Sequence, residues 1–176
     1  EDIKTKYISP EEFWALYSRS NETVRVLTVN VEILKALWKD RDILDCSDAC
    51  TIDSALLQIA MTRIFDQQFE RLTGREIVEQ SPDYNTGRGV LIFGASEEAR
   101  FKALNRFRAS AGPDVWVQGS DEPTAIGLAI PAEIGLVGFF AYGYPKQERK
   151  IEEFLALNPG RPAILIGVGG AIDYFA

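Results

Sequence analysis

The sequence predicts an α/β fold in which a mostly parallel sheet is flanked by helices. Two observations predict it: continuous apolar runs rich in β-branched residues alternate with segments of helical spacing, and several of these runs end in small, glycine-containing turns. Continuous apolar strands are typical of parallel sheets that are covered on both faces. Because no repeat, low-complexity tract or linker divides the 176 residues, we expect one Rossmann-like domain over residues 1–176.

The first half of the chain begins this alternation. TVRVLTV predicts a strand at residues 23–29, and VEILKALWKD predicts a helix at 31–40. SALLQIAMTRIF predicts a helix at 54–65, with Asp53 as its N-cap because a short acidic side chain there accepts hydrogen bonds from free backbone N–H groups. PDYNTGRG, residues 82–89, is rich in turn formers and predicts a loop within the domain.

The second half continues the alternation. An amphipathic helix is expected over residues 97–110 and closes near Gly112 and Pro113. Pro145 is expected as the first residue of another helix, because its fixed φ and missing N–H suit that position. A last helix is expected to start just before the chain ends. Strands are expected at residues 89–96, 114–119, 134–143 and in the first part of 161–176.

The carboxyl edge of this sheet is where a ligand is expected. In open parallel sheets, ligands bind beyond the carboxyl ends of the strands. The turns that follow Val29, Phe93, Tyr142 and Ile166 should therefore crowd one edge.

Composition excludes several classes of function. The chain has no histidine, so histidine-based triads and histidine-ligated metal sites are excluded, and a general base must be Asp, Glu or a strongly perturbed Lys or Tyr. The net charge of −7 argues against general nucleic-acid binding. Cys46 and Cys50 match neither a redox nor a zinc spacing. No secretory leader or membrane-spanning run is evident, so a cytoplasmic location is expected.

Two turns differ in what they offer an anion. Gly167, Gly169 and Gly170 allow a ligand to approach the backbone, and the helix that follows offers N–H donors. A tight turn that needs glycine for packing is an equal alternative. By contrast, Glu97 and Glu98 follow the turn after Phe93 and would repel a phosphate, so that turn is expected to line a rim at most.

The helix after Pro145 begins unusually. Lys146 places a cation where the helix dipole is already positive, whereas most helices favour acidic residues in that turn. This predicts that an anion such as a diphosphate binds there, with Gln147 able to bond a sugar or phosphate. A solvated lysine is the alternative that the residues leave open.

Four polar residues at other junctions are also candidates. Asp53 follows a short apolar run and can serve as a base as well as a helix cap. Thr28 and Asn30 end the first strand, and Asn30 can equally cap the next helix. Arg71 can bind a phosphate through two N–H groups, with an ion pair to a neighbouring glutamate as the alternative.

In this order, these segments resemble the bacterial glycosyltransferases of the WecG/TagA/CpsF type. TVNVEIL is similar to the family's T-x-N-x-E-I element, CTIDSALL to its P-D-G-x-G segment, and FERLTGREIV to E-R-x-x-G-x-D. YGYPKQE resembles the signature G-x-P-K-Q-E, and IGVGGAIDYFA resembles G-V-G-G-x-F-D. The resemblance runs from Val24 to the last residue, and the final two motifs together are highly specific.

The resemblance implies a hexosyltransferase of teichoic acid or related polysaccharide synthesis. It would move an N-acetylhexosamine-type sugar from a UDP donor to a polyprenyl-diphosphate-linked saccharide, with inversion, without a metal or cofactor, and at the cytoplasmic membrane face. The resemblance leaves open whether the chain forms a homo-oligomer. Asp53 matches the family's base, and Gln147 and Arg71 match its other catalytic positions. The implied substrate-binding residues are Thr28, Asn30, Gly143, Pro145, Lys146, Glu148, Gly167, Gly169, Gly170 and Asp173.

The sequence departs from the family pattern in three ways, of which the Ser54 substitution and the short chain favour a second hypothesis. Ser54 stands where the family has a glycine after the base, an H-G-Y-F-like element is largely missing, and the family continues past the position of Ala176 into a basic, aromatic appendage. The second hypothesis is a non-catalytic nucleotide-sugar-binding module that regulates or scaffolds a partner enzyme. A nicotinamide-dependent oxidoreductase is disfavoured because no early glycine fingerprint follows the first strand.

Overall fold

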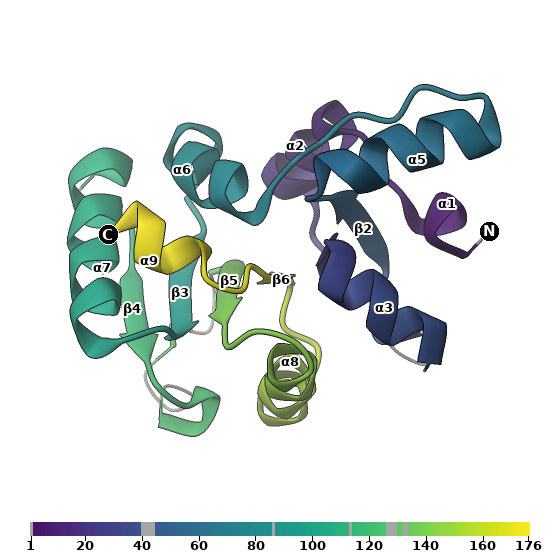
Figure 1. The fold of residues 1–176 in the computed structure, drawn as a ribbon. Coiled ribbons are helices and arrows are strands. Elements are labelled where there is room, and N and C mark those ends of the chain that lie inside the picture. Colours follow the sequence, from purple (N-terminus) through teal and green to yellow (C-terminus); the bar gives the residue numbers. More distant parts are fainter. Residues whose placement is uncertain (1, 40–44, 86, 113, 126–129, 132–133) are drawn as a thin grey trace.

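The computed structural model describes residues 2–39, 45–85, 87–112, 114–125, 130–131 and 134–176. Within them, six strands form one sheet in the order β2-β1-β6-β5-β3-β4, and every neighbouring pair is parallel. Helices cover both faces (Figure 1). The expected α/β architecture is thus confirmed. The strands are β1 (Val24–Val29), β2 (Ala49–Ile52), β3 (Gly89–Gly94), β4 (Val117–Ser120), β5 (Leu136–Ala141) and β6 (Ala163–Gly167).

The helices form two layers. On one face of the sheet, α2, α6, α7 and α9 share a core with side chains from five of the strands. On the other face, α3 and α5 pack over β1 and β2, and α8 packs over β3, β5 and β6. The helices are α1 (Asp2–Lys6), α2 (Pro10–Arg19), α3 (Val31–Lys39), α5 (Ala55–Phe65), α6 (Gly74–Tyr84), α7 (Glu97–Ala111), α8 (Lys146–Leu157), α9 (Ala171–Phe175) and the short 3₁₀ helix η1 (Pro123–Ala125).

The crossover pattern opens a crevice between β1 and β6. The helix after β1, α3, packs on one face of the sheet, whereas the helix after β6, α9, packs on the other. Neighbouring strands whose connections leave in opposite directions form a crevice at their carboxyl ends. The fold therefore opens a crevice at the edge where the sequence predicts a ligand.

Helices α1, α2 and α6 and the short 3₁₀ helix η1 were not anticipated from the sequence. Helix α2 begins with a capping box between Ser9 and Glu12, and α6 begins with one between Thr73 and Glu76. The Ser/Thr-x-x-Glu spacing was a readable signal for both. The loop expected at residues 82–89 is partly wrong, because Pro82 lies inside the last turns of α6.

Two helix starts differ from the expectation by one residue. Ser54, not Asp53, is the N-cap of α5, and its hydroxyl accepts a hydrogen bond from the Leu57 N–H at 3.4 Å. Pro145 is the N-cap of α8 instead of its first residue, and the helix begins at Lys146. The first correction leaves the Asp53 carboxyl available for other contacts.

Candidate functional site

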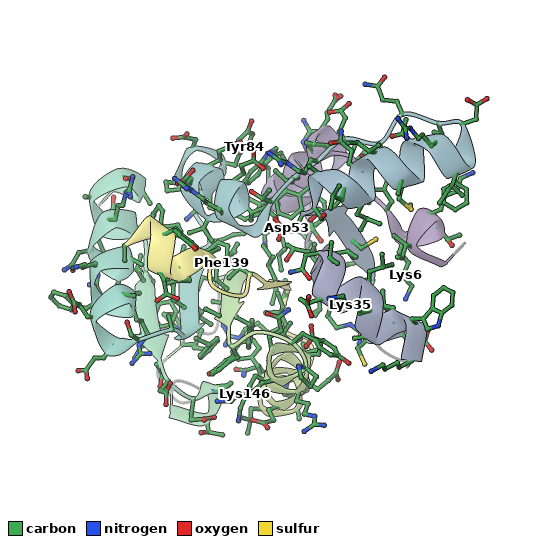
Figure 2. The ribbon with its side chains drawn as sticks, in the orientation of Figure 1. Lys6, Lys35, Asp53, Tyr84, Phe139 and Lys146 are labelled. Carbon is green, nitrogen blue, oxygen red and sulfur yellow. The ribbon has the colours of Figure 1, made fainter. Side chains whose placement is uncertain are left out.

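A cleft of about 1190 Å³ lies at the carboxyl edge of the sheet. Its walls come from the ends of β1 and β2, from α3 and α6, and from the turns after β5 and β6. In Figure 2, Asp53 lies near the centre of this region, and Lys35 lies on the α3 side. Ligand pockets commonly measure about 300–1,000 Å³, so this cleft has room for a ligand larger than most.

Asp53 is held where β2 meets the N-terminus of α6. Its backbone N–H donates to the Val29 carbonyl at 2.9 Å, and its carboxyl accepts a hydrogen bond from the N–H of Gly74, the first residue of α6. Burial raises the pKa of the Asp53 carboxyl, against the lowering effects of the Gly74 hydrogen bond and the Arg71 charge. A carboxyl with a raised pKa in a cleft is a candidate general base.

The N-terminus of α6 packs tightly against the turn after β6. A Cβ at Gly74 would lie 3.1 Å from the Val168 carbonyl oxygen, so glycine permits this approach. The capping box holds the same turn of α6, because the Thr73 N–H and hydroxyl both donate to the Glu76 carboxylate at 2.8 Å. Asp53 therefore faces a helix end whose position is fixed from two sides.

Arg71 reaches the cleft from an extended segment beside β2. Leu72 donates its N–H to the Ile52 carbonyl at 3.0 Å, which continues the parallel pairing past the end of β2. The Arg71 side chain lines the cleft, and its charge lowers the pKa of Asp53. Among the described residues, no ion pair joins Arg71 to Glu70 or Glu76, the two neighbouring glutamates that were the alternative partners.

Thr28 and Asn30 line the cleft, and the side-chain oxygen of each forms hydrogen bonds within the protein. The buried Thr28 hydroxyl donates to the Gly167 carbonyl at 2.7 Å, which joins β1 to β6 at the crevice. Asn30 accepts hydrogen bonds from the N–H groups of Glu32 and Ile33, both at 3.0 Å. Asn30 therefore caps α3, as the sequence predicted it could.

Gln147 connects α8 to the glycine turn. Its side-chain carbonyl accepts a hydrogen bond from the Gly169 N–H at 3.2 Å, and its amide nitrogen donates to Glu148 at 2.9 Å. The residue is only 2% exposed. A Cβ at Gly167 would lie 2.5 Å from the Gln147 amide nitrogen, so the packing explanation holds for that glycine. The Gly169 N–H is already bonded and is not a free donor.

Eight of the predicted site residues meet in the cleft and five do not. Those that line it are Thr28, Asn30, Asp53, Arg71, Gly143, Gln147, Gly169 and Gly170. Those that the structure does not bring to its walls are Pro145, Lys146, Glu148, Gly167 and Asp173.

Lys146, which the sequence predicts to bind an anion, lies outside the walls of the cleft. Its ammonium group lies 4.9 Å from the centre of the Tyr142 ring, on the exposed side of α8. Figure 2 shows it well apart from Asp53. This cation–π contact gives the Lys146 ammonium group a neighbour within the protein. The anion contact of Lys146 stays a prediction.

Glu148 and Asp173 also lie outside the cleft. Glu148 lines a separate small cavity beside Arg25 and Cys46, and burial raises the pKa of its carboxyl. Asp173 is an exposed residue in the first turn of α9. Gly167 lines the same small cavity as Glu148, and Pro145 is exposed.

Several lining residues were missed from the sequence. Lys35 and Lys39 project from α3, and Arg75 and Glu79 from the unanticipated α6. Tyr174, on α9, lies with its ring centre 5.9 Å from the Arg75 guanidinium. The spacing of charged residues in the sequence could have predicted the charged face of α3. The chain crossover that turns this face toward the cleft could not be predicted in the same way.

Two negative findings apply to the described residues. None of their Asp, Glu and Cys side chains gather in a group of three that could ligate a metal ion. Among the described helices, none combines the length and apolar character needed to cross a bilayer.

Comparisons with known proteins agree with the motifs. A model of the glycosyl transferase WecG/TagA/CpsF family matches residues 2–176. The N-acetylglucosaminyldiphosphoundecaprenol N-acetyl-beta-D-mannosaminyltransferase of Bacillus subtilis (strain 168) is 26% identical over 161 residues. The match covers 86% of this chain and 62% of that protein, so the chain spans less than two thirds of the relative's length.

The contact between Gly167 and Gln147 predicts a coupled pair. Gly167→Ala should destabilise the fold by about 1–3 kcal/mol, because its methyl group would displace the buried Gln147 amide. In a Gln147→Ala background the same change should be much less destabilising. Urea unfolding of the four proteins of this double-mutant cycle measures the coupling. Equal losses in both backgrounds would show that the glycine is needed for another reason.

The raised pKa of Asp53 predicts a pH-dependent stability difference. Above the ordinary carboxyl pKa of about 3.9, the unfolded state loses its proton before the folded state does, so ionisation works against folding. Asp53→Asn should therefore gain stability relative to wild type as pH rises from 3.5 to 7, with Asp83→Asn, at an exposed position of α6, as control. Urea unfolding at both pH values measures this gain, and a constant difference would contradict it.

Proposed function

The chain belongs to the glycosyl transferase WecG/TagA/CpsF family, and on that premise we propose that it transfers an N-acetylhexosamine-type sugar from a UDP donor to a polyprenyl-diphosphate-linked saccharide. The observation that carries the proposal is the Asp53 carboxyl, held at the N-terminus of α6 and beside Arg71 in a large cleft. The name of the relative supports the acceptor class, because it specifies a diphosphoundecaprenol-linked N-acetylglucosamine and an N-acetylmannosaminyl group.

Asp53 is the proposed general base. Burial makes its carboxylate more basic than a surface aspartate, and the chain has no histidine to take that role. The carboxylate accepts the proton of the acceptor hydroxyl as its oxygen bonds to the anomeric carbon. The bond from that carbon to the diphosphate breaks on the opposite side, and UDP leaves with the electron pair. A single displacement of this kind inverts the anomeric configuration.

Arg71 is the proposed partner of the leaving diphosphate. Lys35 and Arg75 already form ion pairs with Glu32 and Glu79 at 2.7 and 2.8 Å. Arg71 instead interacts with Asp53, whose negative charge is lost when it accepts the acceptor's proton. The guanidinium is then free to stabilise the charge that develops on UDP, the role that we propose in place of a metal ion.

The glycine turn contributes less than its motif implies. The N–H groups of Gly169 and Ala171 are bonded to Gln147 and Val168, so they hold the turn together. Gln147 and Thr28 are therefore proposed as residues that position the turn and the crevice. Because the proposed acceptor is lipid-linked, we place the reaction at the cytoplasmic face of the plasma membrane.

Replacing Asp53 separates catalysis from binding. Asp53→Asn keeps an acceptor for the Gly74 N–H but cannot take a proton, so transfer should fall by about 10²–10⁴-fold. UDP affinity, measured by calorimetry, should stay within about twofold. The transfer assay uses UDP-N-acetylmannosamine and a polyprenyl-diphosphate-linked N-acetylglucosamine. UDP binding with no transfer by the wild-type chain would instead support the non-catalytic module.

Arg71 and Lys146 should differ in their effect on the donor. Arg71→Ala should weaken UDP binding by about tenfold, as expected for loss of a charged hydrogen bond. Lys146→Ala should leave UDP binding unchanged, since its ammonium group lies over Tyr142 and not in the cleft. Calorimetric titration of both variants compares them. The reverse order would restore Lys146 as the residue that binds the diphosphate.

A further inference from the structure

The carboxylate of Glu148 forms no ion pair with any residue that the structure describes. Its Oε1 atom accepts a hydrogen bond from the Gln147 amide nitrogen at 2.9 Å, and its buried Oε2 atom has no partner within the described part of the chain. Arg25 borders the same small cavity, but its guanidinium bonds Asp48 and Glu152. A buried, unpaired carboxylate lowers stability, so packing alone does not explain why a glutamate stands here.

The side-chain amide of Gln147 lies between two unlike partners. Its carbonyl oxygen accepts a hydrogen bond from the Gly169 N–H at 3.2 Å, while its nitrogen donates to the Glu148 carboxylate. An ionised carboxylate only accepts hydrogen bonds, and a backbone N–H only donates them. Reversing the amide would therefore place its nitrogen against an N–H group and its oxygen against a carboxylate. Glu148 thus permits one orientation of the Gln147 amide.

The same amide ties the glycine turn after β6 to α8. Gln147 is buried, and its amide nitrogen lies so close to Gly167 that only a residue without a Cβ fits there. Gly169 has a positive φ of 53°, a backbone conformation that the chain adopts in sharp turns. The hydrogen bond from its N–H to Gln147 holds this turn against the first residues of α8. The orientation of the amide therefore decides whether the turn is held.

The glycine turn is also a wall of the cleft. Val168 and Gly169 both line it. The backbone of Val168 packs against Gly74, whose N–H donates to the Asp53 carboxyl. A displacement of the turn would therefore move the wall beside the proposed base. Glu148 lines a different cavity, so it can affect the cleft only through the residues that it holds.

We propose that Glu148 is a positioning residue for sugar transfer: its carboxylate orients the Gln147 amide, which holds the glycine turn in place at the wall of the cleft. The inference rests on the proposed function, because the turn affects transfer only if the cleft holds the sugar donor. Glu148 touches none of the reacting groups and acts on the rate through the position of the turn. A misplacement of about 1 Å that originates far from the reacting atoms can lower a rate by about 10²-fold.

The first test follows hydrogen exchange of the Gly169 amide by NMR, with all variants at the same pH. In the wild type this N–H is bonded to Gln147 and should exchange slowly. Glu148→Leu removes the acceptor that orients the amide, so exchange at Gly169 should become about tenfold faster, as expected for loss of a hydrogen bond. Glu148→Gln keeps a carbonyl acceptor and should give an intermediate rate. Unchanged exchange in Glu148→Leu would overturn the proposal.

The second test compares kcat with melting temperature. Glu148→Gln should melt no lower than the wild type, because it removes an unpaired buried charge, yet its kcat should fall. Glu148→Leu should lower kcat by at least about tenfold. The matched control is Glu153→Ala, because Glu153 is an exposed glutamate of α8 that pairs with Lys150 at 2.7 Å, and it should retain wild-type kcat and exchange. A lower melting temperature with unchanged kcat in the Glu148 variants would show a structural role and contradict the proposal.

A double-mutant cycle tests whether Glu148 acts through Gln147. In a Gln147→Ala background, Glu148→Leu should change neither exchange at Gly169 nor kcat any further, because no amide is left to orient. Equal effects in both backgrounds would overturn this route. The exchange measurement also keeps the inference separate from the proposed function. If the wild-type chain transfers no sugar, faster exchange in Glu148→Leu keeps the control of the turn and removes the transferase.

Discussion

The close approach of the α6 N-terminus to the turn after β6 is the constraint on which the site depends. Gly74 makes that approach possible, since any larger residue would meet the backbone of Val168. The same residue donates its N–H to the Asp53 carboxyl, so one helix end fixes both the carboxylate and the wall opposite it. Arg71 lies just before that helix and reaches the cleft from the same segment. The proposed base and its cationic partner are therefore set by a single packing contact.

The fold and the binding edge could be predicted from the sequence because apolar runs and glycine turns report local preferences. The identity of the residue that caps α5 could not be predicted, because Asp53 and Ser54 are both good caps. The tertiary contact between the Asp53 carboxyl and the Gly74 N–H decides between them. The neighbour of Lys146 could not be predicted either: its ammonium group lies over the Tyr142 ring, and the residue is not part of the cleft wall. Spacing alone does not show which neighbour a side chain finds.

The central claim is that the cleft is a UDP-sugar site that works without a metal ion. The most direct measurement is a thermal-shift titration with UDP, UDP-N-acetylmannosamine, GDP-mannose and NAD, each with and without EDTA. A ligand that binds only the folded state raises its apparent stability. The melting temperature should rise with the UDP ligands alone, and EDTA should leave that rise unchanged. A rise with none of the nucleotides, or one that EDTA abolishes, would contradict the claim.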